Sequence, residues 1–309
     1  MVVSKVEYSH SNAIALFFGL GLIGNTFYEL IHKKFICQDE SLPFDWDKQE
    51  QTTLEIQQII QKILDLKDEK TDKIDIFWTA GKGGFEESDL VLQQEMEKFK
   101  AGVSLLIHSL SALFPQKITL HFFSSAGGLF EGQSYIHEHS VPQPLRPYGQ
   151  LKLDQENYLK SFENNCNIFI YRPSTVYGYK KNGRSGLIKK ILLDSIQGKT
   201  VQIFASINAL RDYILVDDIA QFLLYNFKGY HAAEKTHCFF LVSGKPSPIY
   251  EILQAVKKIV RKSIFTQYTS VKNNSLDITF SRNLIPEALQ ITPLTQGIEL
   301  TYRKMKIDQ

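Results

Sequence analysis

The sequence predicts an α/β protein built on a buried parallel sheet. Mostly apolar runs recur along the 309 residues, and each stops at a cluster of small or polar residues before a helical pattern begins. Buried parallel strands have this character, and their carboxyl ends are where open α/β sheets bind ligands. The clearest runs span residues 13–18, 74–78, 118–123 and 167–171.

The first run, AIALFF, leads into a glycine-rich turn over residues 19–24 and then into a helical pattern that reaches about His32. This order of strand, G-x-G-x-x-G and helix lets backbone amides approach a pyrophosphate at the positive end of the helix. The turn therefore predicts a dinucleotide site. Its predicted cofactor contacts are Gly19, Gly21, Leu22, Ile23 and Gly24.

An acid that could hold an adenosine ribose hydroxyl lies twenty residues past Gly19. This residue, Asp39, follows a short strand-like segment, and Glu40 stands beside it. The other interpretation is a plain loop acid. A carboxylate at this place disfavours a ribose phosphate, so NAD is preferred as the cofactor and NADP stays possible.

The run 74–78 follows an amphipathic helix predicted over about residues 48–66, and it ends in the small-residue segment 79–84. Small residues directly after a strand let a cofactor lie across the strand ends, and a tight turn has the same composition. Ala80 and Gly81 are predicted to contact the cofactor, and Lys82 the substrate.

The run 118–123 ends in a pair of serines, and a loop with three prolines then leads to Tyr148 and Lys152. These two residues are four apart, so on a helix they share one face. A neighbouring ammonium stabilises a phenolate that takes a proton from an alcohol, and a serine hydroxyl can hold the substrate oxygen. The predicted catalytic residues are Tyr148, Lys152, Ser125 and, as the second choice of hydroxyl, Ser124.

Three further patterns have simple structural explanations. A second Tyr-x-x-x-Lys, Tyr302 with Lys306, occurs in a charged terminal helix, so the spacing alone is not diagnostic. Arg211 could clamp a diphosphate, and a salt bridge to Asp212 or Asp217 is the alternative. Asp217 and the following Asp218 are most simply a helix cap.

Composition narrows the class of protein. A net charge of +2, with 22% charged residues and no basic stripe, predicts no nucleic-acid partner. Three cysteines without a C-x-x-C spacing predict a reducing compartment, no disulfide frame and no metal site. The apolar run 13–24 is interrupted by glycine and is shorter than a membrane span. We therefore expect a cytoplasmic protein without a membrane partner.

Together these segments resemble the extended short-chain dehydrogenase/reductase family, in particular the NAD-dependent epimerases and dehydratases that act on nucleotide sugars. The resemblance implies a doubly wound parallel sheet of the Rossmann type with a smaller, mostly C-terminal substrate-binding region. The dinucleotide-binding domain would span 1–173, with 211–245 returning to it, and the substrate-binding region would span 174–309. The matching segments are FFGLGLIG, WTAGKGG, SSAGGLFEG, PYGQLK, RPSTVYG and RDYILVDD.

The resemblance also implies roles for single residues. Tyr148 would be the catalytic base, and Lys152 its partner and the contact of the nicotinamide ribose. Pro173 and Tyr177 would border the nicotinamide end. The substrate contacts would be Lys82, Ser125, Tyr148, Thr175, Arg184 and Arg211.

Three positions and one segment depart from the family pattern. Thr175 stands in the place of an asparagine that often touches substrate, and the region between Gly24 and Trp78 is compressed. Phe18 stands in the place of the family's first glycine. Counting back from Leu129-Phe130-Glu131, the usual catalytic serine or threonine falls on Ala126, which leaves Ser125 or Ser124.

The reaction that the resemblance favours is epimerisation of a nucleotide sugar. Dehydratases of the family carry an acidic pair after the catalytic hydroxyl, whereas Ala126 and Gly127 follow Ser125 here. A nucleotide-sugar ketoreductase and a non-catalytic dinucleotide-binding protein are the alternatives. The family commonly forms a homodimer through two helices, here residues 90–112 and 149–162.

Overall fold

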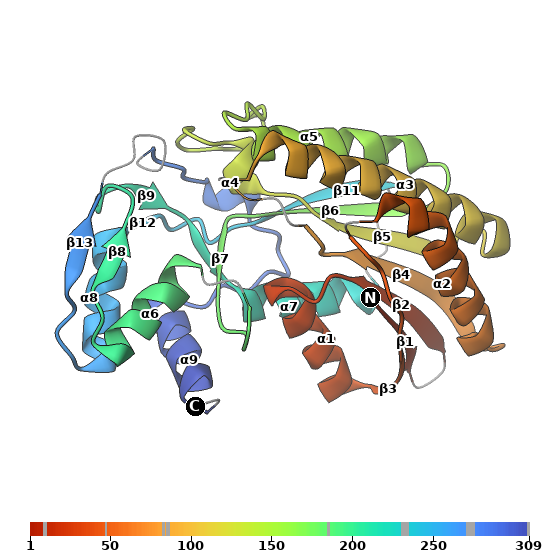
Figure 1. Cartoon of the computed structure of the whole chain (residues 1–309), viewed down its shortest axis with the longest axis horizontal. Helices are drawn as coiled ribbons and strands as arrows, with labels where there is room; N and C mark the ends of the chain where they lie inside the picture. The colour runs from red at the N-terminus through yellow and green to blue at the C-terminus, as the bar shows by residue number, and fades with distance from the viewer. Residues whose placement is uncertain are drawn as a thin grey trace.

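A seven-stranded sheet forms the centre of the molecule, and helices cover both of its faces (Figure 1). The structure is a computed structural model that describes residues 1–8, 11–46, 48–81, 84, 87–183, 186–229, 235–269 and 276–307. From one edge of the sheet to the other, the strands are β11 (Thr236–Leu241), β6 (Asn167–Pro173), β5 (Ile118–Phe123), β4 (Thr71–Trp78), β2 (Asn12–Phe18), β1 (Val2–Glu7) and β3 (Ile36–Ser41).

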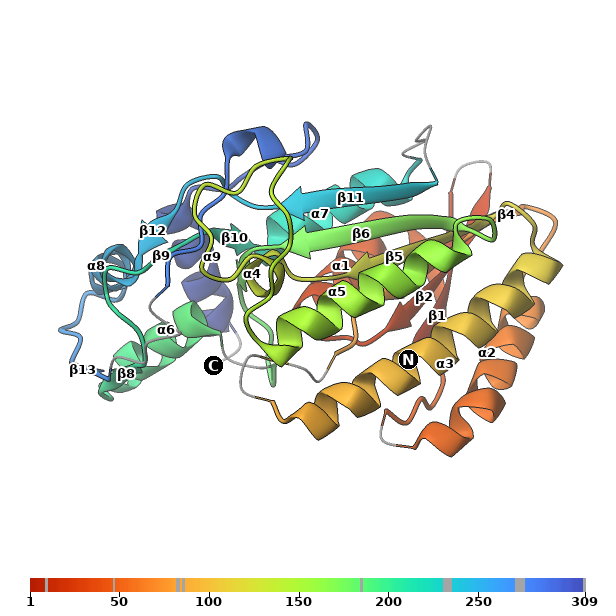
Figure 2. The same ribbon diagram turned by 90° about the horizontal axis from the view of Figure 1, so that it is seen from above.

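The two faces of the sheet carry different helices. Helices α2 (Thr52–Leu66), α3 (Asp89–Leu113) and α5 (Pro147–Leu159) lie side by side over one face (Figure 2). Helices α1 (Leu22–Lys34) and α7 (Val216–Phe227) pack together against the other. Every residue of β2 is buried, because neither face of that strand meets water. The predicted doubly wound α/β fold is confirmed.

Strand β1 runs against its neighbours and is not predicted from the sequence. It pairs antiparallel with β2 on one side and with β3 on the other, so β2 and β3 are parallel but not adjacent. Neighbouring strands lie about 4.8 Å apart, which puts β3 about 10 Å from the strand that leads into the glycine turn. An acid on β3 is therefore one strand further from the turn than in the usual arrangement.

A smaller lobe lies beside the carboxyl ends of the central strands (Figure 1). Its helices α6 (Leu187–Gln197), α8 (Ile249–Val260) and α9 (Leu294–Ile307) share one apolar cluster. Its short strands are β7 (Thr175–Tyr177) with β10 (Tyr213–Leu215), β9 (Leu210–Arg211) with β12 (Ser247–Pro248), and β8 (Val201–Ile203) with β13 (Thr266–Tyr268). The division at residue 173 remains a prediction, and β11 and α7 come from the segment expected to return to the sheet.

The helix cap predicted for Asp217 and Asp218 is wrong. Helix α7 begins at Val216, one residue before the pair, so both side chains leave from within its first turn. Asp217 pairs with Lys304 at 2.5 Å, and Asp218 accepts hydrogen bonds from the amide and hydroxyl of Thr292. The two acids therefore fasten the C-terminal segment to α7.

Within the described part of the chain, none of the helices has the length and apolar composition needed to span a bilayer.

A buried polar chain crosses the middle of the sheet. Asn226 Nδ2 donates to the Tyr171 hydroxyl at 3.0 Å, which leaves that hydroxyl to donate to His121 Nδ1 at 2.9 Å. His121 Nε2 then carries the proton and donates to Asp75 Oδ1 at 3.0 Å, so His121 is neutral in this arrangement. Lys73 approaches the other oxygen of Asp75 at 3.2 Å.

We expect this chain to make the fold acid-sensitive near neutral pH. Burial lowers the pKa of His121 although Asp75 opposes the shift. Below about pH 6.5, His121 is therefore protonated in the unfolded state and stays neutral in the folded state. As the pH falls further, the free energy of unfolding decreases by up to about 1.4 kcal/mol per pH unit. Denaturant unfolding at pH 7.5 and 5.5 should show a smaller pH difference for His121→Gln than for the unchanged protein. An equal difference in both would contradict a buried neutral His121.

Candidate active site

The glycine turn lies at the point where the chain leaves β2 in one direction and β4 in the other. Gly19 follows β2 with a φ of +90°, a conformation that side chains rarely adopt. A Cβ on Gly19 would stand 2.6 Å from the Cα of Ala80, the second residue after β4. The hydroxyl of Thr79 donates to the carbonyl oxygen of Gly19. The segments predicted to hold a cofactor, 19–24 and 80–81, are thus in direct contact at a topological switch point.

The start of α1 fits a pyrophosphate. Gly21 precedes the helix, and no described heavy atom lies within 4 Å of the place where its Cβ would be. No side-chain hydrogen bond to the cap is found among the described residues, and the first turn contains no acid. The helix amides therefore face open space with their partial positive charge. Lys180, which the sequence did not single out, donates to the carbonyl oxygen of Leu20 in the same turn.

We expect Gly24→Ala and Gly21→Ala to separate folding from dinucleotide binding. A Cβ on Gly24 would lie 2.3 Å from the Gly19 carbonyl oxygen and 2.4 Å from Thr79 Oγ1, so α1 must shift, at a cost of about 1–3 kcal/mol. Gly21→Ala meets nothing in the protein and changes only the space left for a ligand. Thermal unfolding and NAD calorimetry should show both properties weakened in Gly24→Ala and binding alone weakened in Gly21→Ala. Unchanged NAD binding in both variants would contradict this placement of the dinucleotide.

Tyr148 and Ser125 come together through a contact between two short segments. Ser125 begins the four-residue helix α4 (Ala126–Leu129), and its Oγ accepts a hydrogen bond from the amide of Gly128 at 3.0 Å. A Cβ on Gly128 would lie 3.2 Å from the ring of Tyr148, the second residue of α5. The bond from Gly128 fixes Ser125 Oγ and leaves the hydroxyl proton to be donated. Ser124 Oγ is buried and has no hydrogen-bond partner among the described residues.

Lys152 is buried one turn along α5 and points toward the end of β4. Its Nζ lies 5.9 Å from the centroid of the Tyr148 ring and 3.7 Å from where a Cβ on Gly81 would be. It donates to Gln155 Oε1 at 3.0 Å and pairs with Glu95 Oε1 at 3.7 Å. Neither partner is predicted from the sequence, although Gln155 lies three residues after Lys152 and residues with this spacing are neighbours on a helix. Glu95 comes from α3, so only the packing of two helices brings it there.

A cavity of about 230 Å³ opens between the sheet and the smaller lobe, and its lining includes Gly127 and Arg146, the residue two positions before Tyr148. Arg211 lines it and donates from Nη1 to the carbonyl oxygens of Leu210 and Leu276. The two acids proposed as its salt-bridge partners have other partners. Asp212 accepts hydrogen bonds from the hydroxyls of Ser174 and Ser243, and Asp217 forms an ion pair with Lys304. Burial lowers the pKa of Arg211 from its ordinary value. The predicted substrate contact Thr175 also lines this cavity.

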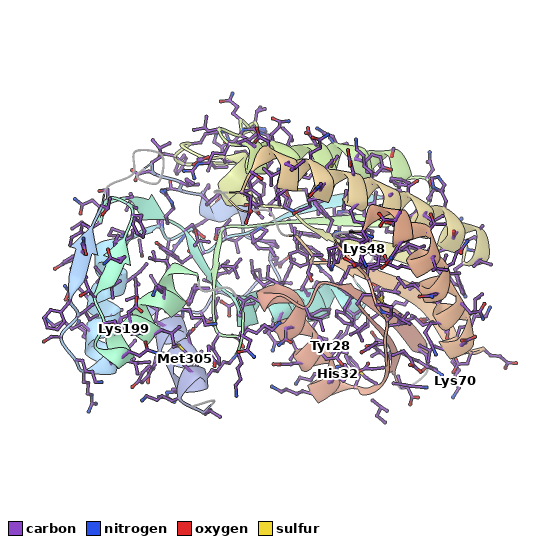
Figure 3. All side chains as sticks on the ribbon, in the orientation of Figure 1. Tyr28, His32, Lys48, Lys70, Lys199 and Met305 are labelled. Atoms are coloured by element: carbon purple, nitrogen blue, oxygen red, sulfur yellow. The ribbon has the colours of Figure 1, made fainter. Side chains whose placement is uncertain are left out.

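Asp39 has partners within the protein. Its carboxylate accepts hydrogen bonds from Ser4 at 2.5 Å and from Tyr28 at 2.5 Å, and His32 Nε2 lies 2.7 Å away. Tyr28 and His32 both extend from α1 (Figure 3). Burial would raise the pKa of Asp39, but these hydrogen bonds bring it below its ordinary value. The ribose role of Asp39 stays a prediction, and this placement does not favour it.

Of the four remaining predicted site residues, the structure describes Pro173 and Tyr177, and they lie in different parts of the molecule. Pro173 ends β6 at the ligand edge of the sheet. Tyr177 is buried in the smaller lobe, and a Cβ on Gly297 of α9 would lie 2.0 Å from its hydroxyl, so its ring packs against α9. Its contact with the cofactor stays a prediction. Lys82 and Arg184 lie outside the described residues.

The structure combines a doubly wound sheet, a glycine turn, a helix with Tyr-x-x-x-Lys and a cavity at one edge of the sheet. This combination is typical of enzymes that use a dinucleotide cofactor. The comparison with protein families is specific: residues 79–239 match the model of the NAD dependent epimerase/dehydratase family. The chain belongs to this family. A curated relative, "Putative UDP-glucose 4-epimerase" of Methanocaldococcus jannaschii, is 28% identical over 142 residues. That match covers 44% of this chain and 45% of the relative, less than half of its length.

Solved structures show the same fold over nearly the whole chain. A UDP-glucose 4-epimerase of Thermus thermophilus in complex with NAD aligns over 94% of this chain and 98% of its own, with a TM-score of 0.70 and 17% identity. A UDP-glucuronic acid 4-epimerase of Bacillus cereus with UDP-glucuronic acid and NAD covers 96% and 99%, with a TM-score of 0.72 and 18% identity. The UDP-glucose 4-epimerase of Thermotoga maritima with UDP-glucose covers 95% and 99%, with a TM-score of 0.72 and 18% identity.

Proposed function

We propose that this protein is a nucleotide-sugar epimerase that uses NAD as its cofactor. The observation that carries the proposal is the position of Tyr148 and Lys152 at the edge of the sheet where the glycine turn meets Ala80. The names of the similar proteins support the same substrate class, since they include epimerases with UDP-sugars and NAD. Family membership supports NAD independently of Asp39.

The chain's own residues divide the work of binding and proton transfer. The start of α1 and the contact of Gly19 with Ala80 would hold the dinucleotide. Tyr148 would take the proton of a sugar hydroxyl, with the ammonium of Lys152 stabilising the phenolate. Ser125 would donate a hydrogen bond to the same sugar oxygen, and Arg211 would bind the diphosphate. When bound, NAD supplies an acceptor for hydride at the sugar carbon, which permits the carbon to be inverted.

Identifying the nucleotide retained after purification tests the proposal. The protein is denatured, the released nucleotide is analysed by mass, and the intact protein is incubated with UDP-glucose or UDP-galactose without added cofactor. Retained NAD and interconversion of the two sugars are expected. Activity that needs a supply of NADPH would indicate a ketoreductase, and bound dinucleotide without turnover of either sugar would favour a non-catalytic binding protein.

We also propose a homodimer through α3 and α5. The two helices lie side by side over one face of the sheet (Figure 2), as a paired-helix interface requires. Sedimentation velocity at micromolar concentration should give twice the mass of one chain. A monomer at that concentration would remove this part of the proposal.

A further inference from the structure

The cavity between the sheet and the smaller lobe contains an acid whose role the family motifs do not explain. Glu131 lines the cavity, and only 4% of its side chain is exposed. Burial raises the pKa of Glu131 from its ordinary value, against the opposing effect of Arg146. A buried carboxylate with one of its oxygens unpartnered is costly, so its presence inside a cavity needs a reason.

Two polar atoms of residues that line this cavity, one on Glu131 and one on Tyr213, have no hydrogen-bond partner within the described part of the chain. Glu131 Oε2 is shielded from solvent and has no hydrogen-bond partner among the residues that the structure describes. The hydroxyl of Tyr213, which lines the same cavity, is in the same state within the described chain. Asp212, the cavity's other acid, differs because both of its oxygens accept from Ser174 or Ser243. A polyol entering the cavity would offer hydroxyls to both unpartnered atoms.

Glu131 lines the cavity close to the segments that carry Ser125 and Tyr148. It follows α4, whose Gly128 contacts the Tyr148 ring, and its Oε1 is 2.8 Å from Nε of Arg146, two residues before Tyr148. Since the proposed function requires Tyr148 to reach the sugar, Glu131 and Arg146 are the charged pair of the cavity that lies nearest in the chain to the proposed base.

The ion pair also determines which sugars the site accepts. Arg146 is 15% exposed, and its charge is already matched by the carboxylate of Glu131. A hydroxyl of a neutral sugar can donate a hydrogen bond to Glu131 Oε2. A sugar with a carboxylate at this end would bring a second negative charge to a guanidinium that is already paired, next to a buried anion. Like charges at such close range discriminate against the wrong partner.

We propose that Glu131 is a specificity-determining residue: its carboxylate accepts a hydrogen bond from a hydroxyl of a neutral nucleotide sugar and, by holding Arg146, excludes nucleotide sugars that carry a carboxylate. This inference rests on the proposed epimerase function, since it assumes a nucleotide sugar in the cavity. It separates two of the substrates found with similar folds, UDP-glucose and UDP-glucuronic acid.

The test compares kcat/KM for UDP-glucose and UDP-glucuronate in the unchanged protein, in Glu131→Gln and in a matched control. Glu131→Gln keeps the size and removes the negative charge opposite Arg146, so the positive charge of Arg146 can attract a carboxylate. We expect the unchanged protein to prefer UDP-glucose and Glu131→Gln to shift the ratio toward UDP-glucuronate by about 10-fold or more. The control is Glu156→Gln, because Glu156 is equally buried and pairs with Arg172 at 2.6 Å outside the cavity. Its ratio should not change.

The outcomes separate this inference from the function on which it rests. If the unchanged protein converts neither sugar and calorimetry shows no nucleotide-sugar binding, the proposed function fails. A preference of the unchanged protein for UDP-glucuronate overturns the role of Glu131, as does an active Glu131→Gln with an unaltered ratio. Should Glu131→Gln not fold, Glu131→Asp, which keeps the charge, must retain the preference for UDP-glucose, and its loss would overturn the inference.

Discussion

Replacing Tyr148 with phenylalanine is expected to lower kcat for nucleotide-sugar conversion by about 10²–10⁴-fold. The substitution removes one hydroxyl and keeps the ring that packs against Gly128, so the contact between α4 and α5 remains. Dinucleotide binding should persist, because the groups that would hold the pyrophosphate lie on the glycine turn and α1. The measurement is steady-state turnover, with retained nucleotide determined on the same preparation.

The chain provides a matched control for that substitution. Tyr302 and Lys306 of α9 have the same spacing, and Lys306 Nζ lies 5.9 Å from the Tyr302 ring centroid, as Lys152 does from Tyr148. Tyr302 packs in the smaller lobe, away from the cavity, so Tyr302→Phe should leave turnover unchanged. Comparable losses in the two variants would show that the effect is not specific to the site. Undiminished turnover in Tyr148→Phe would exclude this phenol as the base.

Replacing Asp75 with asparagine is expected to lower the free energy of unfolding by about 3 kcal/mol, the lower end of the range for breaking a buried ion pair. Asp75 is nearly the same size as asparagine, so packing is preserved while the charge opposite Lys73 and His121 is lost. Burial alone would raise the pKa of Asp75, and Lys73 and His121 instead bring it below its ordinary value. The lower end is chosen because Lys73 is 27% exposed and can recover some hydration.

Glu299→Gln is the control for the Asp75 variant. Glu299 pairs with Arg303 at 2.6 Å on the surface of α9, where both side chains are largely exposed. Loss of such a pair costs about 0.5 kcal/mol or less. Equilibrium unfolding in denaturant measures both variants. A cost for Asp75→Asn no larger than that of the surface variant would mean that the buried chain does not stabilise the sheet.

The parts of the fold that the sequence predicts well are those determined locally. The run 13–18 is apolar throughout because both faces of β2 are covered, and the glycines after it specify the turn. The insertion of β1 between β2 and β3 is decided by strand pairing, which no local pattern reports. The expectation for Asp39 used only its spacing from Gly19, which does not report that β1 lies between β2 and β3, so the ribose role of Asp39 stays a prediction.

The same distinction holds for the active site. Tyr148 and Lys152 are readable because one helix carries both. Glu95 is predicted by no periodicity, since it reaches Lys152 only when α3 packs on α5. Glu131 and Arg146 meet because the loop between them folds back to the start of α5. The direction of Tyr177 depends on how β7 pairs with β10, which turns the ring toward α9.

A crystal structure of the protein with NAD and a UDP-sugar would test the central claim most directly. The predicted result is a pyrophosphate at the start of α1 beside Gly21, with the Tyr148 hydroxyl within hydrogen-bonding distance of a sugar hydroxyl in the cavity lined by Arg211. A dinucleotide bound away from the glycine turn, or a Tyr148 hydroxyl facing solvent in that complex, would contradict the account.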